Sequence, residues 1–176
     1  MEVRVGTSGW SYPSGDGTWN GIFYPARGRG NRPRGFDELT YYAEDFNTVE
    51  VNSTFYRPPS AAVTRRWVER TPSDFVFSLK LHQQFTHPKM FQAATGAATW
   101  SVGQPDVDRS LLGLDPIASA GKLGVLLAQF PSSFKQNERS LSYLEWLLTR
   151  THEWPIAVEL RHRSWSDSMA DTVTRA

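Results

Sequence analysis

Five short runs of apolar, β-branched or aromatic residues alternate along the chain with longer stretches that carry a helical pattern. The runs have the length of buried strands, and each intervening stretch is long enough to cross back over a sheet. This alternation predicts an α/β protein built on a parallel sheet. The expected strands are residues 3–7, 48–55, 75–81, 123–130 and 155–161.

The stretches between these runs predict the helices. Residues 36–46 carry apolar side chains at helical spacing, with the acidic residues on the other face. Ser60 is the expected N-cap of a second helix, which the Thr71-Pro72 pair ends. Ser140 is the expected N-cap of a strongly apolar helix before the last strand. Residues 82–121 contain several glycines and prolines, so two short helices and a loop are expected there.

Five strands with helical crossovers suit either an open doubly wound sheet or the first part of a (β/α)₈ barrel. Alternation directs Glu50 and Asn52 to one face of their strand, Lys80 to one face of the next, and Glu159 and Arg161 to one face of the last. Helices cover both faces of an open parallel sheet, which leaves little place for charge within its strands. The charged face therefore favours a TIM-barrel-like fold.

The length of the chain bears on this prediction. A complete barrel of eight strands typically takes about 250 residues, whereas this chain has 176 and ends just after the fifth expected strand. We expect one domain over residues 1–176 that is incomplete at its carboxyl end and lacks roughly three βα units. The alternative is a natural partial barrel whose open edges are covered by oligomerisation.

Several sequence blocks follow one another over almost the whole chain: GTSGWSY at 6–12, W-x-G-x-FYP at 19–25, TVEVNSTFYRPPS at 48–60, W-x-x-R-TP-x-x-F-x-F-x-x-K at 67–80, THP at 86–88, KLGVLLAQFPSSF at 122–134 and AVELRHRSW at 157–165. In content and order these blocks resemble the YecE-like proteins, domain-of-unknown-function family 72. The resemblance implies a TIM-barrel-like fold with a site at the carboxyl ends of the strands, and no settled activity.

Composition and missing motifs exclude several classes of function. The formal net charge is +1, so no global field favours nucleic acid or an anionic membrane, and the absence of cysteine excludes thiolate catalysis, disulfides and zinc–cysteine sites. No secretion signal or long apolar segment is present, so we expect a cytoplasmic protein. No HExxH, EF-hand, GxGxxG, Walker or GxSxG pattern occurs, and the sequence predicts no particular metal or cofactor.

Polar residues near the strand ends are the candidate site. Glu50 and Glu159 are the expected acid/base or metal-binding carboxylates, and Lys80 with Arg161 is expected to hold an anionic group, although an ion-paired structural role is the alternative. His87 follows the third strand on a loop, where function often resides. The further candidates for substrate binding are the hydrogen-bonding residues Asn52, Gln129 and His162, and the rings of Trp10, Tyr12, Tyr56 and Trp165; Trp19 is a further ring near a strand end.

Two functions remain open from the sequence. The first is an enzyme acting on a small polar or phosphorylated substrate, through hydrolysis of a glycosidic or phosphoester bond or through sugar isomerisation. The second is a non-catalytic protein that binds nucleic acid or an aromatic ligand through its rings and a Gly/Arg-rich segment at 28–35. The arginines concerned are Arg27, Arg29, Arg32 and Arg34, for which a solvated flexible loop is the favoured interpretation.

Overall fold

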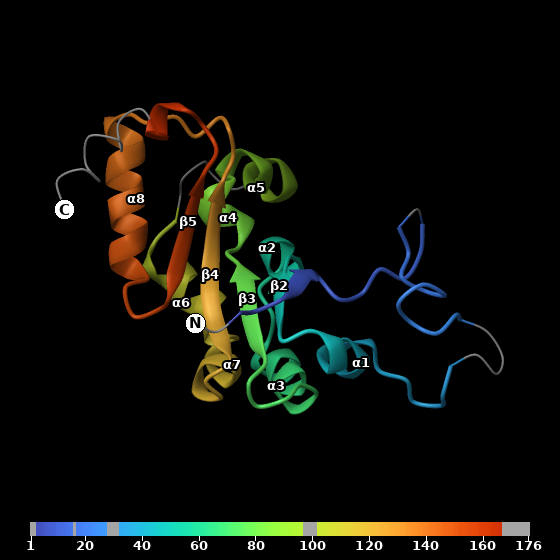
Figure 1. Ribbon diagram of the computed structural model, residues 1–176. Helices are drawn as coiled ribbons and strands as arrows, with labels where there is room; N and C mark the ends of the chain where they lie inside the picture. Colours follow the sequence, from blue (N-terminus) through green and yellow to red (C-terminus); the bar gives the residue numbers. More distant parts are fainter. Residues whose placement is uncertain (1–2, 16, 28–31, 97–101, 167–176) are drawn as a thin grey trace. The chain divides into compact units, whose positions relative to one another are not determined.

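The computed structural model describes residues 3–15, 17–27, 32–96 and 102–166. Five parallel strands form a sheet in the order β1-β2-β3-β4-β5 (Figure 1). Sequential order is typical of a (β/α)₈ barrel, whereas in a doubly wound sheet the strand order reverses part-way, at a switch point beside the first strand. The TIM-barrel-like class is therefore confirmed over these five strands. They are β1 (Gly6–Ser8), β2 (Thr48–Val51), β3 (Val76–Lys80), β4 (Leu123–Phe130) and β5 (Ile156–Leu160).

Helices occupy every crossover. The expectation of two short helices before β4 was wrong, because four form among the described residues there. Pro88 and Pro116 each lie in the first turn of one of these helices, and Gly96 ends the helix that Pro88 begins, with a left-handed φ of 75°. The helices are α1 (Glu38–Asp45), α2 (Ser53–Tyr56), α3 (Ala61–Glu69), α4 (Gln83–Thr86), α5 (Pro88–Thr95), α6 (Gln104–Leu112), α7 (Asp115–Ser119) and α8 (Glu138–Arg150).

The chain divides into two compact units. The first unit consists of Met1–Asn52, Pro59–Ser78 and Gly113–Gly124, and the second of Ser53–Pro58, Leu79–Leu112 and Val125–Ala176. The first unit therefore contains β1, β2, α1, α3 and α7, while the second contains β5 and the remaining helices. β3 and β4 begin in the first unit and end in the second.

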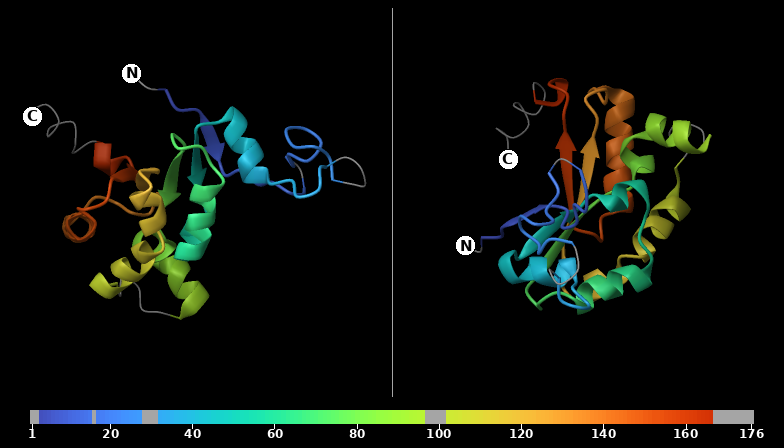
Figure 2. Two further views of the ribbon diagram at one scale, coloured as in Figure 1. Left: turned by 90° about the horizontal axis from the view of Figure 1, so that it is seen from below. Right: turned by 90° about the vertical axis from the view of Figure 1, so that its right-hand side faces the viewer.

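Aromatic side chains form much of the core of the first unit. The fully buried Tyr42 of α1 accepts a hydrogen bond from Thr7 N at 2.9 Å and donates one to Thr48 O at 2.9 Å. Its hydroxyl therefore ties α1 to both β1 and β2, while its ring stacks on Phe46 at 4.6 Å. α3 and α7 lie side by side (Figure 2).

The second unit packs α8 along β4 and β5 (Figures 1 and 2). Leu147 of α8 and Phe130 of β4 are fully buried. The expected N-cap of this helix was wrong, because Asn137 and not Ser140 occupies that position. Asn137 Oδ1 accepts a hydrogen bond from Ser140 N at 2.9 Å, so the helix begins three residues earlier, at Glu138.

Alternation along β2 and β3 follows the expected pattern. Val49 and Val51 are buried while Glu50 is half-buried, and Phe77 and Leu79 are buried on either side of a half-buried Ser78. Residues of β5 show no such contrast, because all five are half-buried. β5 lies at one edge of the sheet, so its apolar residues have a neighbouring strand on one side only.

The expected boundaries of the first two strands shift for local reasons. β1 begins at Gly6 rather than residue 3, with Val3 and Val5 largely exposed. β2 ends at Val51 because the following residues turn into α2. The expected N-cap of α3 is confirmed, because Ser60 occupies that position, although its hydroxyl makes no capping hydrogen bond.

Lys122 is a buried cation that supports the first unit. Its Nζ donates to Val68 O at 2.9 Å, to Thr71 O at 2.8 Å and to Thr71 Oγ1 at 3.0 Å. These acceptors lie at the carboxyl end of α3 and just beyond it, where backbone carbonyls lack partners within the helix. Burial lowers the pKa of the Lys122 ammonium. The three hydrogen bonds therefore compensate a desolvated charge while tying β4 to α3.

Lys122→Met should lower the free energy of unfolding by about 2–3 kcal/mol, because it leaves the α3 carbonyls buried without their donor. Chemical denaturation measures this loss. Arg65→Met, at an exposed position on α3, is the control and should change stability by less than about 0.5 kcal/mol. An unchanged midpoint for Lys122→Met would show that the ammonium is dispensable.

Candidate functional site

The expected site residues fall into two sets, one in each unit. We describe each set within its own unit. The first unit holds Trp10, Tyr12, Glu50 and Asn52, and the second holds Tyr56, Lys80, Gln129, Glu159, Arg161, His162 and Trp165.

In the first unit, Glu50 and Asn52 meet at Ser8. Ser8 ends β1 directly opposite Glu50 in the β1–β2 register, and its Oγ donates to Glu50 Oε1 at 3.1 Å. Asn52 Nδ2 donates in turn to Ser8 Oγ. Sequence reasoning missed Ser8, although its place directly after the first expected strand was the available signal. The three side chains form a small polar group at the carboxyl ends of two neighbouring strands.

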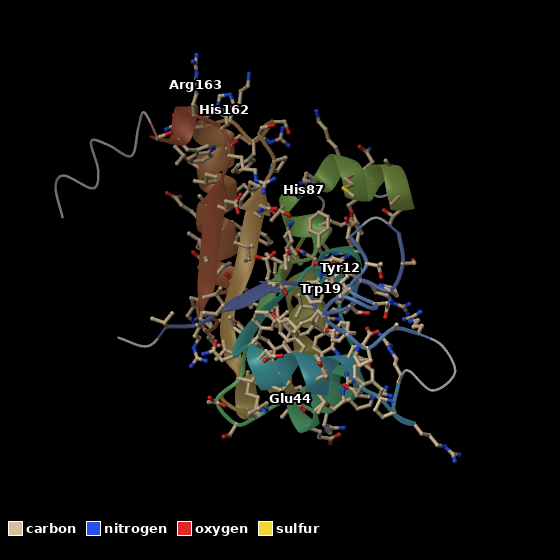
Figure 3. The ribbon with its side chains drawn as sticks, turned by 45° about the vertical axis from the view of Figure 1, so that its right-hand side comes forward. Tyr12, Trp19, Glu44, His87, His162 and Arg163 are labelled. Carbon is tan, nitrogen blue, oxygen red and sulfur yellow. The ribbon has the colours of Figure 1, made fainter. Side chains whose placement is uncertain are left out.

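The rings of the first unit pack mainly against one another. Tyr12 and Trp19 lie side by side with ring centroids 4.8 Å apart (Figure 3). Trp10 packs edge-on against Trp67 of α3 at 5.5 Å. Tyr12 is 37% exposed and is the most accessible of these four rings.

The Gly/Arg-rich segment is not a uniformly solvated loop. Arg32 is only 17% exposed; its Nε donates to Pro25 O at 2.7 Å and its Nη1 to Glu38 Oε1 at 3.2 Å. The guanidinium also lies 4.7 Å from the centroid of the Phe36 ring. Arg32 therefore holds this segment against α1. Arg27 and Arg34 are exposed, and Arg29 lies outside the described residues.

In the second unit, Glu159 is the centre of a hydrogen-bonded charge cluster. Glu159 Oε2 accepts from Gln129 Nε2 at 2.6 Å, and Oε1 accepts from Arg161 Nε at 2.6 Å. Gln129 faces Glu159 directly in the β4–β5 register. The hydrogen bonds from Arg161 and Gln129, with the positive charges of Arg161 and Lys80, lower the pKa of Glu159 despite partial burial. Glu159 is therefore an ionised carboxylate at neutral pH.

Phe55 brings Lys80 and His87 together in the same unit. Lys80 Nζ lies 5.0 Å from the centroid of the Phe55 ring, and the His87 ring lies edge-on to Phe55 at 4.9 Å. Burial, followed by the positive charges of Lys80 and Arg161, lowers the pKa of His87. His87 is therefore a neutral imidazole at neutral pH, close to cationic groups.

The chain beyond β5 forms a tight turn. His162 Nδ1 lies 2.8 Å from Ser164 Oγ and accepts from Ser164 N at 3.1 Å, while Gln136 N donates to Ser164 Oγ at 2.9 Å. Figure 3 shows His162 and Arg163 at this end of β5. His162 therefore holds the turn. Tyr56, by contrast, is 63% exposed on α2.

Trp165, which was expected to bind a ligand, lies in the core instead. It is buried, its Nε1 donates to Phe134 O at 2.7 Å, and its ring stacks on that of Phe134 at 5.4 Å. Its indole faces the core and supports the loop that follows β4.

A cavity of about 580 Å³ lies beside this loop. Its lining comes from the chain that follows β3 and the chain that follows β4, which places it at the carboxyl ends of these strands. His87 is the one lining residue that sequence reasoning had considered; the polar run that follows the fourth strand was a signal for the lining residues beyond β4. The lining residues are Thr86, His87, Pro88, Lys89, Met90, Pro131, Ser133, Phe134, Lys135, Asn137, Arg139, Ser140 and Tyr143.

The part of the chain that the structure describes lacks both a cluster of metal-binding side chains and a membrane-spanning helix. No group of three or more histidine or acidic side chains there could hold a metal ion. No helix among those residues has both the length and the apolar character needed to cross a membrane.

Sequential parallel strands with polar side chains at their carboxyl ends place the chain in the TIM-barrel-like class of α/β proteins. The chain belongs to the DUF72 family, described as a protein of unknown function, whose model matches residues 4–176.

Curated relatives and solved structures agree with this assignment. The chain is 28% identical over 163 residues to the UPF0759 protein YunF of Bacillus subtilis, and 29% identical over 160 residues to the UPF0759 protein YecE of Escherichia coli. These matches cover 93% and 91% of this chain but 52% and 48% of the relatives. The chain thus spans about half the length of the curated relatives it matches.

Crystal structures of DUF72 family proteins share the fold. The protein from Enterococcus faecalis V583 matches with a TM-score of 0.75 at 21% identity, covering 97% of this chain and 55% of that one. The protein from Thermotoga maritima matches with a TM-score of 0.66 at 31% identity, covering 94% and 58%.

Replacing Arg32 by lysine should lower the free energy of unfolding by about 1–2 kcal/mol, because an ammonium cannot reproduce the forked donors or the stacking on Phe36. Thermal unfolding measures this change. Arg34→Lys, in the same segment but exposed, is the control and should melt as the wild type does. Equal melting of the two variants would contradict the anchoring role of Arg32.

The stability of the protein should fall as the pH is lowered through the histidine range. Burial lowers the pKa of both His82 and His87, so the unfolded chain, whose histidines titrate near about 6.5, takes up protons before the folded chain does. The unfolded state then binds more protons, and acidification favours it. Stability is retained above this range and lost as the pH falls towards the folded pKa values.

Melting temperatures measured between about pH 7.5 and 5.5 test this slope. A double variant, His82→Gln with His87→Gln, should flatten it, whereas His152→Gln, at an exposed position, should leave it intact. An unchanged slope in the double variant would assign the pH dependence to other groups.

Proposed function

We propose that the protein acts on a small polar, anionic substrate at the carboxyl ends of β3, β4 and β5. The observation that carries this proposal is the Glu159 carboxylate, which Arg161 and Gln129 hold ionised at the end of an edge strand. Its side chain is 42% exposed, so a ligand can approach it. Catalytic groups in barrels of this class lie at the same ends of the strands.

The ionised state of Glu159 decides its role. A carboxylate with a lowered pKa accepts a proton or orients a hydroxyl, and it is a poor general acid at neutral pH. Glu159 is therefore the proposed base. Lys80 and Arg161 are the proposed partners of an anionic group, and the neutral His87 is a second proton acceptor in the same unit.

The first unit contributes candidates of its own. Glu50 accepts a hydrogen bond from Ser8, and Asn52 donates to the same hydroxyl, so the three residues form a polar group suited to orienting a sugar or phosphate oxygen. Within the first unit, Glu50 is the proposed carboxylate of this group. Hydrolysis of a phosphoester or glycosidic bond and sugar isomerisation all draw on such groups.

The test is turnover of chromogenic probes: p-nitrophenyl phosphate, bis(p-nitrophenyl) phosphate and p-nitrophenyl glycosides. Glu159→Gln should lower turnover of the responsive probe by at least about 100-fold, because the proton acceptor is lost. The melting temperature should change little, since a half-exposed ion pair contributes about 0–1 kcal/mol to the free energy of unfolding. Glu153→Gln, at an exposed position in the turn before β5, is the matched control.

Two results would count against this function. Equal turnover by Glu159→Gln and the wild type would remove the carboxylate from the chemistry. A large loss of thermal stability in Glu159→Gln, with residual activity in proportion to the folded fraction, would assign the cluster a structural role.

A further inference from the structure

The cavity in the second unit carries charge of one sign. Lys89 contributes to it from α5, Lys135 from the loop after β4, and Arg139 from the first turn of α8. None of the described residues that line the cavity carries a carboxylate. Three cationic side chains thus share one cavity of about 580 Å³, where their mutual repulsion favours an anionic guest.

These cations are available to a ligand. All three side chains are exposed, and among the described parts of the chain none of them forms an ion pair or a side-chain hydrogen bond. They differ in this from Arg161, whose guanidinium is engaged by Glu159. An anion entering the cavity would therefore gain charge-assisted hydrogen bonds without breaking existing ones.

Two aromatic rings of the lining are held by contacts within the same unit. Phe134 is buried and stacks on Phe130 at 4.2 Å and on Trp165 at 5.4 Å. Tyr143 is held in place by its hydroxyl, which donates to Phe85 O at 2.6 Å. Rings fixed in this way form a preformed apolar surface, and the cavity volume falls in the range of small-molecule sites. The ligand that fits has an anionic end and an apolar body.

We propose that this cavity binds the phosphate monoester of a small organic molecule, with Lys89, Lys135 and Arg139 around the phosphate and Phe134 and Tyr143 against the organic part. A dianionic phosphate matches three cations better than a carboxylate does, and the forked donors of Arg139 pair with two phosphate oxygens. His87 lines the same cavity and is close to the charges of Lys80 and Arg161. The inference thus deepens the proposed function by naming its substrate class, and it rests on that proposal for turnover.

The test is calorimetric titration with phenyl phosphate, compared with phenol and with inorganic phosphate. Phenyl phosphate should bind at least about tenfold more tightly than either fragment, because only it uses both parts of the cavity. If phenol bound as tightly as phenyl phosphate, the cations would have no part in recognition. If inorganic phosphate bound as tightly, the rings would have none. Absence of binding would overturn the proposal.

The methyl group of Met90 can report whether phenyl phosphate binds in the cavity. The chain contains three methionines, of which Met90 lines the cavity. In the protein labelled with ¹³C at its methionine methyls, phenyl phosphate should shift the Met90 signal, which Met90→Leu identifies. Binding that leaves this signal in place would put the ligand elsewhere.

Substitutions separate the cavity from the reaction. Lys135→Gln with Arg139→Gln should weaken phenyl phosphate binding by at least about tenfold. Arg150→Gln, exposed at the other end of α8, is the matched control and should bind as the wild type does. Unchanged affinity in the double variant would contradict the assignment of the phosphate.

The two proposals fail in different ways. Glu159→Gln should keep phenyl phosphate binding even where it loses turnover. Binding of phenyl phosphate without turnover of any chromogenic probe would sustain the cavity and overturn the proposed reaction. If the double variant loses phenyl phosphate binding but keeps turnover, the proposed reaction stands and the assignment of the cavity is overturned.

Discussion

The structure depends on strands that run parallel and in sequential order. This arrangement brings the carboxyl end of every strand to the same edge of the sheet, so residues far apart in the chain meet there. The β4–β5 register illustrates the consequence, since it sets Gln129 opposite Glu159 and allows one amide to bind one carboxylate at 2.6 Å. A shift of the register by one residue would separate the two side chains onto opposite faces.

The same arrangement explains why the apolar residues of the strands are buried while polar residues are accessible at the strand ends. Val49, Phe77 and Ala128 are buried on the apolar side of their strands, whereas Glu50 and Gln129 are half-buried. Crossover helices supply the apolar cover, so polar residues accumulate on the other face and in the loops beyond it. The candidate groups of both units therefore occupy the ends of strands while the packing lies between strands and helices.

Cations in this protein have different roles according to their partners. Lys122 is buried and satisfied by three oxygen acceptors near the end of α3, and Arg32 is held by Pro25 and Glu38. These side chains stabilise the fold. Lys135 and Arg139 have no such partners among the described residues and line a cavity. The difference between structural and ligand-binding cations thus lies in their acceptors, which composition cannot show.

The sequence by itself determined the alternation of strands and helices, the faces of β2 and β3, and the polar character of the strand ends, because each depends on local periodicity. It did not determine the N-cap of α8, where Asn137 and Ser140 are both suitable residues and the backbone decides between them. Nor did it show that Trp165 faces the core, or that α5 and the loop after β4 enclose a basic cavity. Those features require side chains distant in sequence to meet, so only the tertiary structure decided them.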